Sequence, residues 1–248
     1  MARQGSQIRA SQTEDTYEQL RAAILAGEYL PGSKLKIGEL CERVGGSLGA
    51  VREALSRLLA EGLVLSEPFK GFAVAPVSPE DLIELTEARI EVEKLCLASA
   101  IAHGDLEWEG RLVALLHRLL RLDPSVGASA EMSEWWQVHT EFHEALVSAC
   151  DNGWLLRMHR TLHEQSERYR RLALIVDATP VVRPEAASRD TGAEHKALVD
   201  AAIARDFERI SSAIEVHLRR TTEHLLARLD QSGFNRSGPL AAVGARAG

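Results

Sequence analysis

The chain has 248 residues, of which 45% are hydrophobic and 26% are charged, proportions typical of a globular protein. This length suits one large domain or two small ones. It contains no run of 18 apolar residues and no apolar segment near residue 1, so we expect neither a membrane span nor a secretory signal, and a cytoplasmic location follows.

Charge is distributed unevenly along the chain. Residues 1–77 contain nine basic and nine acidic side chains, so the net charge of −7 comes entirely from residues 78–248. A polyanion would therefore meet the N-terminal part, because the remainder repels it. The three cysteines are widely spaced and show no metal-knuckle pattern, so we expect them to be reduced and buried.

Residues 13–77 are predicted to form three helices followed by a β-hairpin. The helical segments are TYEQLRAAILAGEY, KIGELCERV and, at residues 47–63, SLGAVREALSRLLAEGL. The segment LVLSEPFKGFAVAPV then alternates around a turn at Pro68–Gly71, as a hairpin does. Residues 1–12 and 231–248 lack such a pattern, and we expect both to be disordered tails.

A break at residues 75–82, marked by Pro76 and Pro79, separates this region from a helical one. Six amphipathic helices are predicted, near residues 79–103, 106–122, 130–150, 152–177, 186–204 and 206–230. The sequence therefore predicts a mainly α protein, with a winged helix-turn-helix domain at 13–77 and an all-α bundle at 78–230.

The segment 47–63 has the features of a DNA-recognition helix. An apolar arc is expected to face the core and comprises Leu48, Val51, Leu55, Leu58 and Leu59. The opposite side is small and polar, comprising Gly49, Arg52, Glu53 and Ser56. Arg52 could donate two hydrogen bonds to guanine, and Ser47 at the helix N-terminus could hold a phosphate. Lys70 and Gly71, at the hairpin tip, suit contact with the DNA backbone or minor groove. A packed three-helix cluster that binds no DNA has the same periodicity.

These N-terminal segments resemble the winged helix of GntR-type bacterial transcription regulators. The resemblance is carried by YEQLRAAILAGEYLPGSKLKIGELCERVGG, SLGAVREALSRLLAEGLV and PFKGFAV. It implies contacts with double-stranded DNA at Ser47, Arg52, Arg57, Lys70 and Gly71. Leu48 and Ala50 stand where the family usually has arginine and proline, so the resemblance does not extend to the usual operator sequence.

Four histidines of the helical region lie on rows that face the predicted core. His139 and His143 are four residues apart, and His195 and His217 lie on two later helices. Buried imidazoles require partners, and a divalent metal ion is one such partner.

A second histidine pair, His159 and His163, has the same spacing, so spacing alone does not distinguish the two pairs. A histidine on an apolar row is also often a hydrogen-bonded core residue rather than a metal ligand. The sequence pattern leaves both interpretations open.

The helical region resembles the FCD effector-binding domain found in the FadR branch of GntR regulators. The matching segments are DLIELTEARIEVEKLCLASA, FHEALVSACDN and EHKALVDAAIARDFERISSAIEVHL. The metal site of that domain consists of an aspartate and three histidines, which implies a site here at His139, His143, His195 and His217. His139 stands where the family has the aspartate, and ligation by nitrogen alone favours Zn²⁺ or Ni²⁺.

Arg89 lies in a row that is otherwise apolar. A buried guanidinium requires an anion, and the candidates are Glu93, one turn away, or a small carboxylate effector. The FCD ligand pocket has an arginine at this place, so the resemblance implies that Arg89 binds the effector. The segment ERYRRL adds Arg168, Arg170 and Arg171, which could form a second clamp or a solvated face.

Together these features predict a homodimeric transcriptional repressor rather than an enzyme. It would bind a palindromic operator, and a small organic acid held at the metal site would control that binding. The segment EARIEVEKLCLASAIAHGDLEWEGRLVALLHRL particularly resembles regulators of glutarate and related dicarboxylate catabolism. The alternatives are a metal-responsive regulator without an organic effector and a metal-dependent helical-bundle enzyme. The enzyme alternative lacks a carboxylate within the histidine motif that could act as a base.

Overall fold

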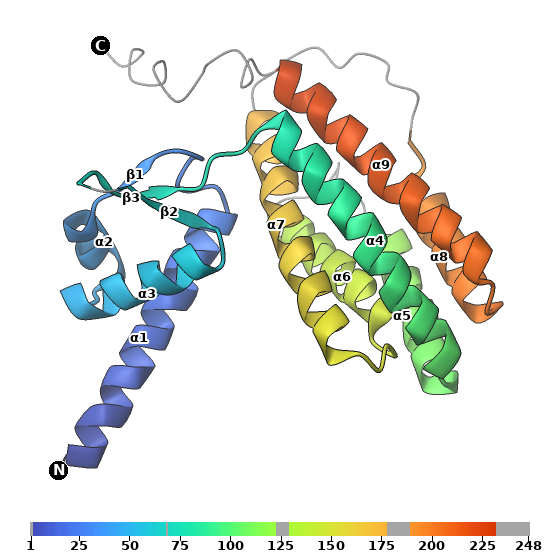
Figure 1. Ribbon diagram of the computed structural model, residues 1–248, viewed down its shortest axis with the longest axis horizontal. Coiled ribbons are helices and arrows are strands. Elements are labelled where there is room, and N and C mark those ends of the chain that lie inside the picture. Colours follow the sequence, from blue (N-terminus) through green and yellow to red (C-terminus); the bar gives the residue numbers. More distant parts are fainter. Residues whose placement is uncertain (1, 68, 123–128, 178–188, 232–248) are drawn as a thin grey trace. The chain divides into compact units, whose positions relative to one another are not determined.

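The structure is a computed structural model that describes residues 2–67, 69–122, 129–177 and 189–231 (Figure 1). In chain order, the elements of these residues are α1 (Ala2–Leu25), β1 (Lys34–Leu35), α2 (Ile37–Val44), α3 (Leu48–Ala60), β2 (Val64–Glu67), β3 (Gly71–Val74), α4 (Pro79–His103), α5 (Leu106–Arg121), α6 (Ser129–Val147), α7 (Gly153–Asp177), α8 (Thr191–Ile203) and α9 (Phe207–Gln231). The predicted mainly α fold, with a winged helix-turn-helix followed by a helical bundle, is confirmed.

The chain divides into two compact units. Among the described residues, the first unit contains 2–82, 165–177 and 225–231, and the second contains the remainder. The C-terminal ends of α7 and α9 thus belong to the first unit, although we predicted a single boundary near residue 78. Each of these helices has 25 residues and is about 37 Å long at the usual rise, so one helix can serve two units.

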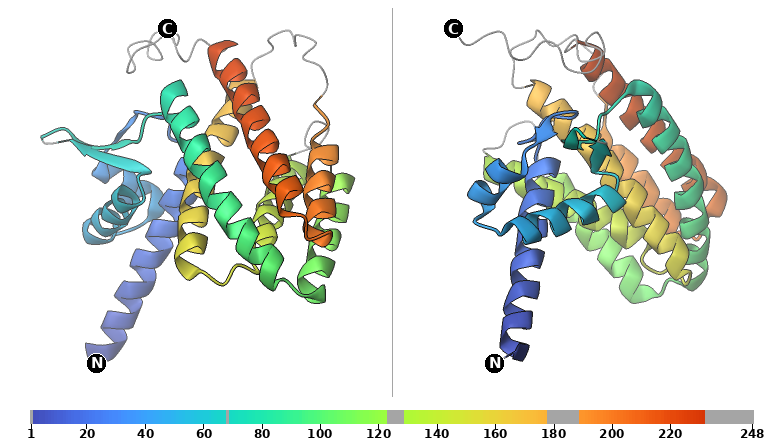
Figure 2. Two further views of the ribbon diagram at one scale, coloured as in Figure 1. Left: turned by 45° about the vertical axis from the view of Figure 1, so that its right-hand side comes forward. Right: turned by 60° about the vertical axis from the view of Figure 1, so that its left-hand side comes forward.

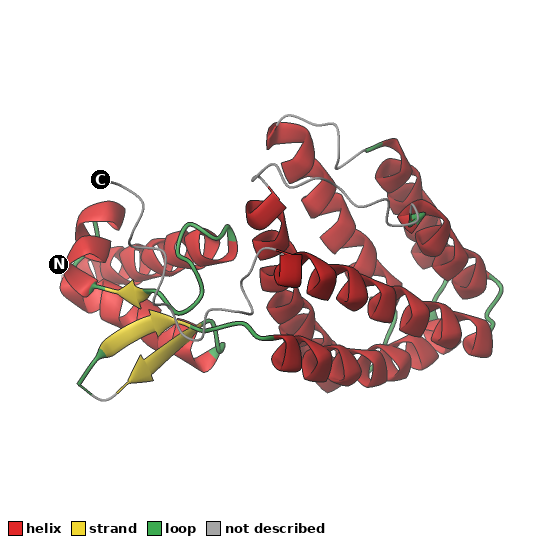
Figure 3. Cartoon of the chain, turned by 90° about the horizontal axis from the view of Figure 1, so that it is seen from above, coloured by secondary structure: helices red, strands yellow, loops and turns green. Residues whose placement is uncertain are grey.

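The first unit has a small hydrophobic core beneath a three-stranded sheet. The three antiparallel strands are seen in Figure 3, and their order is β1-β3-β2. Val64 of β2 lies opposite Val74 of β3. The hairpin was predicted, but β1 was not, because two residues are too few to show an alternating pattern. Side chains from all three helices and all three strands fill the core, among them Leu20, Leu40, Val51, Leu55, Leu58 and Val74.

The turn between α2 and α3 depends on two local features. Gly45 ends α2 in the left-handed conformation, with φ of +62°, which glycine adopts without steric cost. Ser47 then caps α3, because its hydroxyl accepts a hydrogen bond from the backbone N–H of Ala50 at 3.2 Å. This is the geometry expected of a helix-turn-helix.

The apolar arc predicted for α3 is confirmed for three of its five residues and wrong for the other two. Val51, Leu55 and Leu58 are completely buried, whereas Leu48 is 56% exposed and Leu59 is 39% exposed. The buried side of the helix includes Ala50 and Ala54 instead, so it is rotated away from Leu48 and Leu59.

The N-terminal segment also differs from the prediction. We expected residues 1–12 to be a tail, but α1 begins at Ala2 and continues without interruption to Leu25. Adding a residue to an existing helix is far easier than nucleating one, so a polar segment can extend a helix that the following residues anchor. The predicted tail at 231–248 lies outside the described residues except for Gln231, which ends α9.

The second unit is built around one hydrophobic core to which helices α4 to α9 contribute (Figure 2). Its largest fully buried side chains include Ile90, Leu97, Leu112, Phe142 and Leu146. Observed and predicted helix ends agree within three residues, except at α8. That helix begins at Thr191 rather than near residue 186, because the side chain of Asp190 caps it through the N–H of Ala193.

Side-chain contacts place α4 beside both α7 and α9. Arg89 of α4 reaches His163 of α7, and Thr86 of α4 lies 2.6 Å from Thr222 of α9. In Figures 1 and 2, α4 runs alongside these two helices. No helix among the described residues is long and apolar enough to cross a membrane.

Candidate functional site

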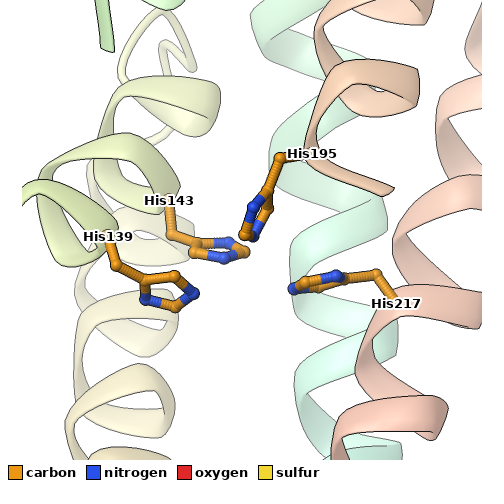
Figure 4. A group of neighbouring side chains, drawn as sticks. All are labelled: His139, His143, His195 and His217. Carbon is orange, nitrogen blue, oxygen red and sulfur yellow. The ribbon is translucent and has the colours of Figure 1, made fainter. Parts of the chain in front are cut away.

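The four histidines singled out from the sequence converge inside the second unit. His139 and His143 come from α6, His195 from α8 and His217 from α9, and their rings face one another (Figure 4). All four are at least 96% buried, and one ligand nitrogen of each lies within 4.8 Å of the others. This set, the four-histidine group, is compact enough to share one metal ion.

His143 lies at the centre of the group. Its ring centroid is 4.6 Å from that of His139 and 5.2 Å from that of His217. Both ring nitrogens are buried and have no hydrogen-bond partner among the described residues. Burial, reinforced by the neighbouring imidazoles, holds the pKa of His143 well below its usual range. His143 is therefore neutral at pH 7 and has a lone pair to offer.

The ring of His217 is oriented by a carboxylate that the sequence analysis missed. Nδ1 of His217 lies 2.8 Å from Oε2 of Glu194 and 3.4 Å from Nη2 of Arg189, which donates to the same carboxylate oxygen at 2.6 Å, so the carboxylate is the closer partner. Burial opposes ionisation of Glu194, but the hydrogen bonds from His217 and Arg189 outweigh it and lower the pKa of Glu194. An ionised carboxylate only accepts, so Nδ1 of His217 carries the proton and Nε2 keeps its lone pair.

An aromatic side chain covers one edge of the group. The ring of Trp135 stacks on His139, with centroids 4.7 Å apart and an angle of 22° between the planes. Trp135 is itself half-buried. It therefore limits the rotation of His139.

Arg89 is buried, as its apolar row indicated, and lies in a second group that contains His159 and His163. Nη2 of Arg89 donates to Oε1 of Glu93 at 2.7 Å and to Nδ1 of His163 at 3.3 Å. The two histidines stack with centroids 5.9 Å apart. We call this set the arginine-linked group. The sequence left two candidate anions for Arg89, Glu93 and an effector carboxylate, and in the structure the guanidinium contacts Glu93.

The arginine-linked group is close enough to bind an ion, but its hydrogen bonds oppose ligation. Ligand atoms of Glu93, His159 and His163 also lie within 4.8 Å of one another. A guanidinium can only donate, so Nδ1 of His163 accepts and the proton of the neutral ring is on Nε2. His163 therefore has no lone pair left for a metal in this arrangement.

The residues predicted to contact DNA belong to the first unit. The side chain of Arg52 is exposed on α3 and makes no ion pair within the described part of the chain. Gly49, Glu53 and Ser56 on the same side are also exposed, as predicted. Ser47 directs its hydroxyl to the N-terminus of α3, where a phosphate would also be held.

Arg57 is placed differently from Arg52. Its guanidinium donates to both carboxylate oxygens of Glu14, at 2.7 and 3.2 Å, and lies 3.6 Å from the ring centroid of Tyr17. The hydrogen bond from Arg57 lowers the pKa of Glu14. Arg57 therefore connects α3 to α1, which the helical spacing of α3 alone does not reveal.

At the hairpin tip, Lys70 and Gly71 are exposed, and Gly71 has φ of +85°. The residue before them, Phe69, is fully exposed and also has a positive φ of 63°. An exposed phenylalanine in this conformation was not predicted, although its place in PFKG offered a signal. Apolar side chains at such tips can contact the sugars and base edges of a minor groove.

The three arginines of the segment ERYRRL do not form a solvated face. Arg168 donates to the carbonyl oxygen of Ala75 at 2.7 Å, and burial lowers its pKa. Arg170 is buried and pairs with Glu167 at 3.0 Å, and Arg171 is half-exposed. These contacts lie within the first unit, so the three arginines are not part of the four-histidine group.

A helix-turn-helix with a hairpin wing, followed by a helical unit, is the architecture of a DNA-binding regulator with a second functional domain. Residues 12–74 match the family described as bacterial regulatory proteins of the gntR family, and residues 84–220 match the FCD domain. The chain therefore belongs to the GntR family of bacterial transcription regulators, with an FCD domain, and it is a DNA-binding regulator and not an enzyme.

Two curated relatives are similar to this chain over most of their length. The HTH-type regulator BphR of Paraburkholderia xenovorans is 40% identical over 207 residues, which cover 83% of this chain and 81% of BphR. The HTH-type transcriptional repressor GlaR of Escherichia coli is 34% identical over 204 residues, covering 82% of this chain and 91% of GlaR. The solved structure of E. coli McbR/YncC has the same fold, with a TM-score of 0.70 at 22% identity over 88% of this chain and 98% of McbR/YncC.

Proposed function

We propose that this regulator is a cytoplasmic, homodimeric repressor whose operator binding is controlled by a small organic acid bound at a metal centre. The relatives that share its two domains include GlaR, which is called a repressor. A two-fold symmetric dimer presents two winged helices, and it therefore binds a palindromic site. The acid acts through a difference in its affinity for the DNA-competent and DNA-incompetent forms.

The observation that supports the metal centre is the burial of His143 with both ring nitrogens unsatisfied. An imidazole in that position loses the hydrogen bonds it makes in water, and a metal ion restores a partner. His139, His143, His195 and His217 would hold the ion, with Glu194 orienting His217. Four neutral nitrogen donors suit Zn²⁺ or Ni²⁺, and the bound cation would attract a carboxylate.

Arg89 is the proposed second anchor of the acid. It is buried in the same unit, and His163, which it contacts, has its ring centroid 5.6 Å from that of His143. A guanidinium and a metal ion together recognise a carboxylate at two points. A dicarboxylate of four to six carbons is the effector class that fits this proposal.

The effector part of the proposal is tested by calorimetry with succinate, glutarate and adipate. We expect binding to the metal-loaded protein and little or none after chelation. Fluorescence anisotropy with the promoter of the regulator's own gene should then show release of DNA by the acid. Equal heats with and without metal would refute the metal centre, and release of DNA by metal alone would favour the metal-responsive alternative.

The DNA part assigns direct contacts to Ser47, Arg52, Lys70 and Gly71, and a weaker contribution to Arg57. Replacing Arg52 by alanine should weaken operator binding by about 1–3 kcal/mol, or roughly five- to 150-fold. Arg57→Ala is the comparison variant, since its guanidinium is paired with Glu14. It should reduce thermal stability more than Arg52→Ala and affinity less. Unchanged affinity of Arg52→Ala would refute the assignment of α3 as the reading helix.

A further inference from the structure

The arginine-linked group contains a carboxylate that chemically duplicates the proposed effector. The Glu93 carboxylate accepts from Arg89 at 2.7 Å, and both side chains are at least 95% buried. Both residues come from α4, four positions apart, so the pair forms within a single helix. Arg89 is therefore already bound by a carboxylate of its own helix.

This ion pair cannot simply break when a ligand arrives. Removing one partner of a buried pair leaves an uncompensated charge in a poorly solvated interior, which is strongly unfavourable. An exchange avoids that cost for Arg89, because one carboxylate remains on its guanidinium before and after the ligand binds. The exchange requires a new partner for the Glu93 carboxylate.

His159 is placed to be that partner. Its Nε2 is 3.8 Å from Oε1 of Glu93, beyond hydrogen-bond distance, and has no hydrogen-bond partner among the described residues. A small rotation of the Glu93 side chain would shorten this distance to a hydrogen bond from the imidazole N–H. The group thus contains one cation, one carboxylate and an imidazole nitrogen that can donate to this carboxylate.

We propose that Glu93 is an internal competitor of the effector: an effector carboxylate replaces Glu93 on Arg89, and Glu93 turns to His159. This inference rests on the proposed function, because it takes Arg89 as the effector's anchor. It makes Glu93 a determinant of both affinity and specificity. A ligand must supply a carboxylate at least as favourable as that of Glu93, so neutral amides and esters of the same shape are excluded.

The exchange predicts that removing the competitor strengthens binding. In metal-loaded Glu93→Gln, Arg89 has lost its internal carboxylate, and glutarate should bind about tenfold more tightly, which corresponds to about 1.4 kcal/mol. Glu91→Gln is the matched control, because Glu91 is an exposed carboxylate on the same helix. Its affinity for glutarate should equal that of the unaltered protein. Neither the unaltered protein nor either variant should bind glutaramide.

Glu93→Gln will also lower the melting temperature without ligand, since it leaves Arg89 without its carboxylate. Glutarate should then raise the melting temperature more in this variant than in the unaltered protein. If Glu93→Gln does not fold, Glu93→Asp keeps the charge but shortens the reach to Arg89. Its affinity should rise in the same direction by a smaller factor.

Calorimetry of the same proteins together with Arg89→Gln distinguishes failure of the proposed effector site from failure of the internal competitor. If Arg89→Gln binds glutarate as well as the unaltered protein, Arg89 is not the anchor, and both the proposed effector site and this inference are overturned. If binding depends on Arg89 but Glu93→Gln binds no more tightly, the effector site stands and the internal competitor is overturned. Tighter binding by Glu93→Gln with an unchanged Glu91→Gln supports the exchange.

Discussion

The four-histidine group and the arginine-linked group of the helical unit each contain a pair of histidines four residues apart. They differ in the residue that contacts the outer nitrogen of a ring. In the first, Glu194 accepts from Nδ1 of His217 and leaves the Nε2 lone pair available. In the second, Arg89 donates to Nδ1 of His163 and leaves a proton on Nε2. One ring is therefore prepared to ligate a cation, and the other is prepared to donate a hydrogen bond.

The comparison shows that proximity of histidines does not define a metal site. Both groups bring three or more ligand atoms within 4.8 Å, and both are buried. The charge of the closest outer partner distinguishes them, because a carboxylate raises the basicity of an imidazole whereas a guanidinium competes with a cation for the same lone pair. The predictions below test this difference, from the largest expected effect to the smallest.

The largest effect is expected for His143→Ala, which should abolish binding of Zn²⁺ or Ni²⁺, since His143 is the central ring of its group. His159→Ala is the matched variant, a buried histidine of the other group. It should bind metal with unchanged stoichiometry and affinity. Equilibrium dialysis with metal analysis measures both. Equal loss of metal in the two variants would show that the arginine-linked group also ligates the ion.

Glu194→Gln should have the next largest effect and weaken metal binding by about ten- to 100-fold, as is usual for an outer carboxylate of a metal-bound histidine. The amide no longer stabilises the proton on Nδ1 of His217 by a charged hydrogen bond. Asp200→Asn is the control on the same helix, since Asp200 pairs with Lys196 at the surface. Competition with a chromogenic chelator gives both affinities. An unchanged affinity for Glu194→Gln would refute the orienting role of this carboxylate.

The sequence was sufficient to predict both domains, most helix ends and the four converging histidines. It did not contain the contacts that separate the two groups, because Glu194 lies 23 residues from His217 and Arg89 lies 74 residues from His163. Periodicity reports which side of a helix faces a core. It does not report which residue of a neighbouring helix stands opposite.

The same reasoning explains the differences in the first unit. Arg52 and Arg57 are five residues apart on α3, and both looked available to DNA. Only the packing of α1 against α3 shows that Glu14 and Tyr17 engage Arg57. The exposure of Leu48 and Leu59 likewise depends on which side of α3 the neighbouring elements cover, and that side includes Ala50 and Ala54.

The third prediction concerns pH. Burial lowers the pKa of His143 and of His159 in the folded protein, whereas an unfolded histidine titrates near 6.5. Below that pH the unfolded chain binds more protons than the folded one, so the free energy of unfolding falls as pH falls. The slope is at most about 1.4 kcal/mol per pH unit for each such histidine.

Urea unfolding of the metal-free protein at pH 7.5 and 5.5 measures this loss. His143→Leu, which keeps a buried side chain but cannot titrate, should show a smaller difference between the two pH values. Metal should also dissociate over the same range, because protons compete for the ligating nitrogens. Equal stability of the unaltered protein at both pH values would show that the buried imidazoles are not held neutral.

The smallest effect is expected for Trp135→Leu, which removes the ring stacked on His139. Aromatic stacking contributes about 0.5–1.5 kcal/mol, so metal affinity should fall by roughly two- to twelvefold. Ni²⁺ should quench the fluorescence of the unaltered protein, and the variant should lose most of that quenching, because Trp135 is in direct contact with a proposed ligand. Trp154→Leu is the control, since Trp154 is exposed and stacks with Arg157 instead. If the two variants are quenched alike, Trp135 does not report on the metal, and the assignment of His139 as a ligand loses its spectroscopic support.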